Sequence, residues 1–386
     1  LILGKLHRDA STKLGAVGKA VVTVPAFFNE PRRKATMDAG RLAGLDVLDI
    51  LNEPTAAAIA YGVKAGYVTE AGEAAKPETI LVYDLGGGTF DVTLMHIQGA
   101  QYSAIATDGD VQLGGIDWDQ RIVDHIGQTF RNKHGLDPRD EPIALQTLLQ
   151  EAEDAKRTLS TRTSVTIRFA HQGKRAQITL TRDDFEEMTR DLMQRTMFTV
   201  ERLLRGAQHA WSDLTRVLLV GGSTRMPMVA EALEAASGMP VDRSLSPDEA
   251  VAHGAALYAG FLQRGTGAMD RNLAVKNVNS HDLGVLGVEK LTGMKRRRIM
   301  IPRNTALPAR SKSQFVTHRD NQRRVVVPVV EGGDDSGNHA TAIGKCVVTE
   351  LPPALPAKTP VIVQFFYMAN GRLSVKASLP DVGSES

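Results

Sequence analysis

The chain has 386 residues and a mass of 41.7 kDa, which is more than one compact core usually accommodates and predicts two or three domains. Its 46 Lys and Arg against 44 Asp and Glu give a formal net charge of +2, which argues against a nucleic acid or an anionic membrane as partner. The single cysteine, Cys346, excludes an internal disulfide and no run approaches the about 20 apolar residues of a membrane span, so we expect a reducing, cytoplasmic location.

Residues 21 to about 260 alternate short β-branched runs with longer alanine-rich stretches, a pattern typical of α/β architecture. Helices are predicted over residues 32–43 and 54–61. A later helix is expected to begin at Ser246, because Ser followed by Pro, Asp and Glu is a typical N-cap sequence. Strands are predicted over residues 21–24, 80–83, 90–95, 101–106 and 217–220.

The periodic pattern lapses over residues 269–280, where we predict a linker between a first domain, 1–268, and a second, 281–386. The second domain is rich in Val, Arg and Pro and is expected to be all β. Its basic run at residues 295–298 is predicted to lie in a hairpin loop, solvated or in contact with an acidic polypeptide, and not to bind nucleic acid. Strands are predicted over residues 324–330, 346–349, 361–368 and 372–379, the last two as a hairpin with one buried face.

The most informative motif is Asp-Leu-Gly-Gly-Gly-Thr-Phe-Asp at residues 84–91, which follows an apolar strand. Glycines in the turn let backbone N–H groups close on phosphate oxygens, because no Cβ is in the way. Thr89 offers a hydroxyl, and Asp84 and Asp91 offer hard oxygens for Mg²⁺ or its waters. The alternative is a tight glycine-rich hairpin without a ligand. The turn is not a Walker loop, because no Gly-Lys-Ser/Thr follows. The predicted phosphate-binding residues are Gly86, Gly87, Gly88 and Thr89.

A second glycine turn ends the strand at 217–220 and reads Gly-Gly-Ser-Thr-Arg. Gly221 and Gly222 would let a flat base lie close to the backbone, with Ser223 beside it and the Arg225 guanidinium stacked on it. The alternative is an ordinary packed turn between a strand and a helix. The pattern after Met226 predicts that helix.

One helix face carries a further polar set at i, i+3, i+4 and i+7, namely Glu153, Lys156, Arg157 and Ser160. A solvated salt-bridge ladder is the simplest interpretation, and a nearby purine and ribose would make the face functional. Glu53 begins the helix predicted at residues 54–61 and is a candidate acid near a phosphate. The ten histidines have no metal-ligand spacing, and no nucleophile motif is present.

Six motifs occur together in one order: residues 22–29 (VTVPAFFN), 52–58 (NEPTAAA), 84–91 (DLGGGTFD), 113–115 (LGG), 155–160 (AKRTLS) and 220–227 (VGGSTRMP). As a set they resemble the DnaK-type family of seventy-kilodalton heat-shock chaperones. The similarity covers the first domain and the linker and continues more weakly through residues 301–305 and 320–322. The resemblance implies an actin-like ATPase fold followed by a β-sandwich that binds peptides.

The resemblance also implies roles for the motif residues. Asp84 and Asp91 would organise Mg²⁺ and its waters, residues 86–89 would hold the β- and γ-phosphates of ATP or ADP, and Glu53 would orient the attacking water. Pro25 and Arg33 match the family's relay between nucleotide state and the peptide-binding domain. The adenosine would be enclosed by Glu153, Lys156, Arg157, Ser160, Gly221, Gly222, Ser223, Arg225 and Asp248.

The function that the resemblance implies is ATP-regulated binding and release of unfolded polypeptides, called clients below, as part of a stress response. J-domain cochaperones and nucleotide exchange factors are the implied partners. Asp49 stands where family members carry a basic residue that docks the J-domain, which places that contact in doubt. The family's first phosphate loop and a phosphate-contacting lysine are expected upstream of Leu1 and a helical lid after Ser386, so we expect the chain as given not to hydrolyse ATP. The rival functions are a degenerate nucleotide sensor or scaffold without turnover and an actin-fold kinase.

Overall fold

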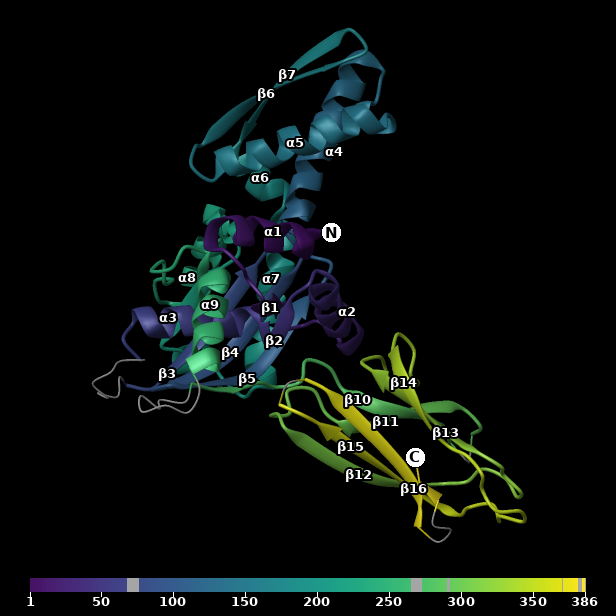
Figure 1. Cartoon of the computed structure of the whole chain (residues 1–386). Coiled ribbons are helices and arrows are strands. Elements are labelled where there is room, and N and C mark those ends of the chain that lie inside the picture. The colour runs from purple at the N-terminus through teal and green to yellow at the C-terminus, as the bar shows by residue number, and fades with distance from the viewer. Residues whose placement is uncertain (68–75, 265–272, 290–291, 370, 381–383, 386) are drawn as a thin grey trace. The chain divides into compact units, whose positions relative to one another are not determined.

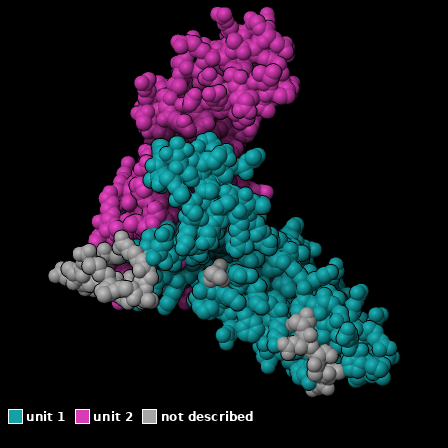
Figure 2. Space-filling model, in the orientation of Figure 1, with its two compact units in different colours: residues 1–52, 101–107, 259–386 teal, residues 53–100, 108–258 magenta. Residues whose placement is uncertain are grey.

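The computed structural model describes residues 1–67, 76–264, 273–289, 292–369, 371–380 and 384–385. These residues form two compact units, which Figure 2 colours separately. Unit 1 comprises Leu1–Asn52, Gln101–Thr107 and Ala259–Ser386, and unit 2 comprises Glu53–Ala100 and Asp108–Tyr258. The predicted linker lies partly outside the described residues, at 269–272, and the division of the chain at that linker stays a prediction.

The centre of unit 2 is a buried sheet in which β3 (Glu78–Leu85) lies between β8 (Arg216–Val220) and β4 (Phe90–Gln98). β3 pairs parallel with β8 and antiparallel with β4. The strands are buried almost throughout, as expected for a sheet covered on both faces. α3 (Glu53–Lys64) packs against β3 and β4, and α7 (Arg190–Gly206) packs against β4. The α/β prediction for this part of the chain is confirmed.

The rest of unit 2 consists of helices and one hairpin. α4 (Gly115–His134) and α5 (Pro142–Leu159) pack together, and the hairpin β6 (Ser164–His171) and β7 (Lys174–Thr181) lies on them (Figure 1). The other helices are η1 (Pro138–Asp140), α6 (Arg182–Met188), η2 (Trp211–Asp213), η3 (Gly222–Arg225), α8 (Pro227–Ser237) and most of α9 (Ala250–Arg264).

Unit 1 combines an N-terminal α/β segment with a β-sandwich. The segment contains α1 (Ile2–Leu14), β1 (Lys19–Val24), α2 (Glu30–Leu42) and β2 (Asp46–Asn52), and β1 pairs parallel with β2. The Asn29 side chain caps α2 by accepting a hydrogen bond from the Arg32 N–H at 3.2 Å. β9 (Ala274–Lys276), from the predicted linker, pairs parallel with residues 101–103 of β5 (Gln101–Asp110).

The β-sandwich has two sheets that enclose an apolar core (Figure 1). The sheet order is β11-β10-β13-β14 in one sheet and β12-β15-β16-β17 in the other. The predicted hairpin is confirmed as β15 and β16, in which Val363 pairs with Ala377 in the buried layer. The strands are β10 (Leu283–Val288), β11 (Lys295–Ile301), β12 (Ala309–Val316), β13 (Val325–Glu331), β14 (Thr341–Val348), β15 (Pro360–Tyr367), β16 (Leu373–Leu379) and β17 (Ser384–Glu385).

Two local predictions are wrong. The basic run at residues 295–298 lies in strand β11, paired with β10, and not in a loop. Arg297 fits a strand because its side chain, which is 5% exposed, pairs with Asp282 and donates to the Gly332 carbonyl. The helix predicted from Ser246 starts four residues later, at Ala250, and residues 247–249 form a turn. The Ser246 carbonyl accepts a hydrogen bond from the Ala250 N–H, and the Pro247 carbonyl is held by the Gly221 N–H at 3.0 Å.

No described helix is both long enough and apolar enough to cross a lipid bilayer. The helices predicted at residues 32–43 and 54–61 are α2 and α3, with boundaries that differ by one to three residues.

The contact between α9 and α3 gives a stability prediction. A Cβ on Gly254 would lie 1.7 Å from the Ala56 carbonyl oxygen, so Gly254→Ala forces the two helices apart and should destabilise the protein by about 3 kcal/mol or more. Gly260, on the same helix, has nothing within 4 Å of the added Cβ, and Gly260→Ala should be neutral or stabilising by about 0.5–1 kcal/mol. Urea denaturation of both variants checks this, and equal effects would contradict the close contact.

Candidate functional site

The triple-glycine turn joins β3 to β4 at one end of the sheet of unit 2. It is closed by a hydrogen bond of 3.0 Å from the Gly86 N–H to the Thr89 carbonyl. Gly87 and Gly88 are exposed at the tip, and a Cβ on either would meet nothing within 4 Å. The space in front of the tip is therefore open to a ligand that approaches the backbone closely.

Three carboxyl groups lie beside this turn. Asp84 and Asp91 are directly opposite each other in the β3–β4 ladder and are 6% and 1% exposed. Burial, and then the negative charges of Glu53 and Asp91, raise the pKa of Asp84 well above its ordinary value. Burial raises the pKa of Glu53, the first residue of α3, to about 7. The sequence predictions for Glu53, Asp84 and Asp91 thus converge on one place, where negative charge is costly unless a cation or water offsets it.

The donor set fits Mg²⁺ in chemistry, because hard carboxylate oxygens are the ligands this ion prefers. Within the described residues, no three His, Cys, Asp or Glu side chains are arranged to hold a metal ion among themselves. A magnesium ion here would accordingly be held by Asp84 and Asp91 together with water and phosphate oxygens, and the metal role of the two aspartates stays a prediction.

A second glycine loop, residues 113–115, is hydrogen-bonded directly to the first. The Gly115 N–H donates to the Gly86 carbonyl, and the Ile116 N–H donates to the Gly87 carbonyl, both at 2.9 Å. A Cβ on Gly114 would lie 2.4 Å from the Gly88 nitrogen, so only glycine fits this position. Because α4 begins at Gly115, the positive end of its dipole lies at the triple-glycine turn and favours an anion there.

Lys156 connects α5 to this loop. Its ammonium donates to the Gly115 carbonyl at 2.9 Å and to Asp119 Oδ2 at 2.8 Å. Asp119 is buried, and its other carboxylate oxygen has no hydrogen-bond partner within the described residues. Burial raises the pKa of Asp119 even though Lys156 lowers it. Sequence reasoning missed Asp119 and the role of the 113–115 loop, because both depend on contacts between distant segments and no local pattern marks them.

The turn after β8 also contacts the triple-glycine turn. Gly221 has φ 86°, and a Cβ there would lie 2.4 Å from the Leu85 carbonyl and 2.7 Å from Asp84 Oδ1. The Ser223 hydroxyl donates to the Gly86 carbonyl at 3.0 Å. The Arg225 guanidinium pairs with Asp248, its Nε lying 2.9 Å from Oδ2. This pair is half exposed, which leaves the planar guanidinium available for stacking while Asp248 fixes its direction.

The helix-face residues are only partly joined to this site. Arg157 forms an exposed ion pair with Glu153 at 2.6 Å, which matches the salt-bridge alternative. The Ser160 hydroxyl donates to the Lys156 carbonyl at 3.1 Å at the end of α5. Lys156 alone of this set contacts the 113–115 loop in the described structure, so the adenosine roles of Glu153, Arg157 and Ser160 stay predictions.

Comparison with known proteins shows which family the chain resembles. A family model described as "Hsp70 protein" matches residues 1–386. Two proteins of Saccharomyces cerevisiae, both named as ribosome-associated molecular chaperones, are each 40% identical to the chain over 392 residues. The match covers 100% of this chain and 62% of each yeast protein, so the chain spans less than two thirds of the length of these relatives.

The raised pKa of Glu53 predicts how stability depends on pH. Unfolded Glu53 loses its proton near 4.5 and folded Glu53 near 7, so the folded state holds the extra proton between these values and stability should fall as pH rises from about 4.5 to about 7. Glu53→Gln should therefore be more stable than the parent by about 1–3 kcal/mol above pH 7 and nearly equal to it at pH 4.5.

Thermal unfolding in magnesium-free buffer from pH 4.5 to 8 measures this difference. Glu201→Gln, which alters an exposed glutamate on α7, serves as the control and should follow the parent at every pH. A Glu53→Gln curve parallel to the parent curve would show that Glu53 ionises normally in the folded protein.

Proposed function

The chain belongs to the Hsp70 protein family, and from that premise we propose that the glycine turns of unit 2 bind ATP or ADP with Mg²⁺. The observation that carries the proposal is the shared carbonyl of Gly86, which accepts hydrogen bonds from Gly115 and from Ser223. These two hydrogen bonds connect three segments that are far apart in the sequence. The tip of the 86–89 turn stays open. The N–H groups of Gly87 and Gly88 at this tip, which donate to no acceptor within the described residues, suit phosphate oxygens.

In the proposed site each group has a separate role. Residues 86–89 bind the terminal phosphates, with the Thr89 hydroxyl donating to one of their oxygens. Asp84 and Asp91 hold Mg²⁺ or its waters, which neutralises phosphate charge. Glu53 orients the attacking water, and its ionised form accepts a hydrogen bond from that water more strongly than the protonated carboxyl does, so the pKa near 7 would make hydrolysis rise with pH through that region. Arg225 stacks on the adenine ring.

We further propose that the β-sandwich of unit 1 binds unfolded polypeptide clients and that nucleotide state controls their release. Contacts inside unit 1 support a route for this control. Arg33 donates to Asn52 Oδ1 at 2.7 Å and to the Ala26 carbonyl at 3.1 Å. The Ala26 carbonyl also accepts a hydrogen bond from the Ser280 hydroxyl, next to the start of the sandwich. Asn52 immediately precedes Glu53 in the chain, so a single segment links the proposed catalytic acid to the sandwich.

Phe27, next to Ala26, makes a further contact with the start of the sandwich. His281 Nε2 lies 2.9 Å from the Phe27 carbonyl, and the rings of these two residues lie 4.3 Å apart. Pro25 begins the same short loop, in which the Phe28 N–H donates to the Pro25 carbonyl at 3.1 Å. Pro25 and Arg33 therefore remain the proposed relay residues, with Arg33 bracing the loop that touches the sandwich.

The remaining parts of the proposal concern partners and location. J-domain cochaperones and nucleotide exchange factors are proposed partners, and Asp49 on β2 still stands where a basic contact is expected for a J-domain. A cytoplasmic location and a role in stress response are also proposals. The family match favours neither a small-molecule kinase nor a scaffold without nucleotide.

The phosphate-site assignment predicts different effects for three substitutions in the natural protein that contains residues 1–386. Asp84→Asn and Thr89→Ala should lower the rate of ATP hydrolysis about a hundredfold, or ~3 kcal/mol, and change nucleotide affinity much less, because these groups act as charge develops. Arg225→Ala should chiefly weaken nucleotide binding, by about 1–2 kcal/mol, because a stacking surface is lost.

Single-turnover hydrolysis and nucleotide affinity, measured together, separate these effects. Arg205→Ala, at an exposed position on α7, is the matched control for the loss of an arginine. Parent-like hydrolysis by the Asp84 and Thr89 variants would refute the assignment. Nucleotide binding without hydrolysis in the parent would instead support the degenerate sensor as the function.

A further inference from the structure

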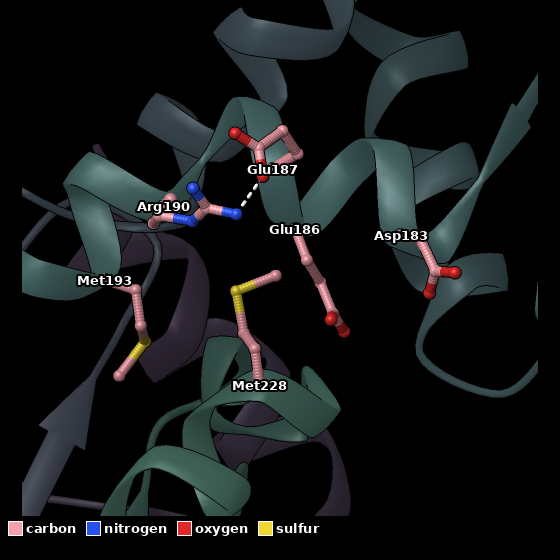
Figure 3. Close-up of a pocket in the computed structure, with 6 residues that line it drawn as sticks. All are labelled: Asp183, Glu186, Glu187, Arg190, Met193 and Met228. Carbon is pink, nitrogen blue, oxygen red and sulfur yellow. Dashed lines mark hydrogen bonds and ion pairs between the residues drawn. The ribbon is translucent and has the colours of Figure 1, made fainter.

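Unit 2 contains a cavity of about 400 Å³ that the proposed nucleotide site does not use (Figure 3). It lies between α6, the start of α7 and the start of α8, and its size falls in the range of small-ligand sites. Six side chains line it, those of Asp183, Glu186, Glu187, Arg190, Met193 and Met228.

Two methionines supply the apolar part of this cavity. Met193 on α7 and Met228 on α8 are each 8% exposed. Figure 3 shows their thioether side chains at the side of the cavity opposite Glu187. Thioether side chains are unbranched and polarisable, so they adapt to aliphatic ligand groups. This surface suits a short chain of methylene groups better than a rigid polar ligand.

The acidic part of the cavity is only partly neutralised. Glu187 pairs with Arg190, as the dashed line in Figure 3 shows. Asp183 and Glu186 form no hydrogen bond or ion pair with any described residue. Arg182, the cation nearest in sequence, is occupied elsewhere, because its guanidinium donates to the carbonyls of Leu159 and Arg162.

The surroundings of Glu186 make its negative charge unfavourable. Burial raises its pKa, and the carboxylates of Glu231 and Asp183 raise it further, while Arg182 opposes them. A carboxylate that is partly removed from water and repelled by two others gains most from a cation that brings its own charge into the cavity.

We propose that this cavity binds a small amphipathic cation, a primary ammonium group on an aliphatic chain of about four to six carbons. The ammonium lies between Asp183 and Glu186, and the chain lies along Met193 and Met228. An anion is repelled by the carboxylates, and a neutral apolar ligand offers the half-buried Glu186 carboxylate no charged partner. Both a lysine side chain of a partner protein and a free alkylamine carry this chemistry.

The test uses the whole chain with ¹³C-methyl methionine and n-pentylammonium as the probe. The chain has 12 methionines, and the methyl signals of Met193 and Met228 are assigned by Met→Leu variants. These two signals should shift and saturate with a dissociation constant on the order of 1 mM, the strength expected for so small a ligand. Pentan-1-ol and pentanoate, which keep the chain and change the charge, should leave the two signals in place.

A pair of variants tests the role of the carboxylate. Glu186→Gln keeps size and polarity and should weaken pentylammonium binding at least about fivefold, by removing a charge-assisted contact. Glu201→Gln, further along α7, is exposed and should leave binding unchanged. Equal shifts with pentan-1-ol, no shift at ten times the expected dissociation constant, or parent-like binding by Glu186→Gln would each overturn the proposal.

A separate experiment distinguishes a lysine side chain of a partner protein from a free alkylamine as the source of the cation. A short peptide with one central lysine is compared with the same peptide acetylated at the lysine side chain. Saturable shifts of the Met193 and Met228 signals with the unmodified peptide alone support a protein-borne lysine. Binding of pentylammonium but of neither peptide supports a free amine as the ligand.

Discussion

Two carboxyl groups buried against each other are the constraint on which unit 2 depends. Asp84 and Asp91 face one another at the end of β3 and β4, within a sheet whose neighbouring residues are apolar. Burial and the charges of Glu53 and Asp91 raise the pKa of Asp84, so ionisation of Asp84 in the folded protein is costly. An apolar pair here would pack at lower cost, so the buried carboxylates do not favour stability by themselves, and they fit the proposed role in binding a cation. The backbone accommodates the pair closely, since Gly221 has no Cβ to collide with Asp84.

The site beside these carboxylates is built from backbone more than from side chains. The carbonyl of Gly86 accepts two hydrogen bonds, from segments 29 and 137 positions further along the chain, and the Gly114–Gly88 contact leaves no room for a Cβ. A cradle of this kind has few rotatable groups, so little conformational entropy is lost when a ligand binds. The same closeness means that a shift of one segment displaces the others, which is a physical basis for sensing whether the site is filled.

The sequence located most of this site because its chemistry is local. Asp84 lies at the end of one strand, and the three glycines and Thr89 follow it directly. The sequence of the β15–β16 hairpin alternates apolar and polar residues, which predicts one buried face. Contacts between distant segments were not predictable in the same way. Nothing local marks Asp119 as the partner of Lys156, and a run of four basic residues looks like a solvated loop until Asp282 is found to neutralise Arg297. The turn at residues 247–249 similarly follows from its neighbours, against a strong local helix signal.

The two acidic regions of unit 2 show how surroundings, more than charge, decide which cation a site suits. At Asp84 and Asp91 the carboxylates are rigid, buried in the sheet and bordered by backbone N–H groups, so a compact divalent ion shared with phosphate oxygens satisfies both the charge and the donors. At the second region Asp183 is exposed and Glu186 is half-buried, and two thioether side chains lie beside them. A compact, strongly hydrated ion would leave that sulfur-lined surface unused, whereas an ammonium on an aliphatic chain contacts both. The two acidic regions of unit 2 thus favour cations of different size. The proposed ammonium site does not involve the nucleotide.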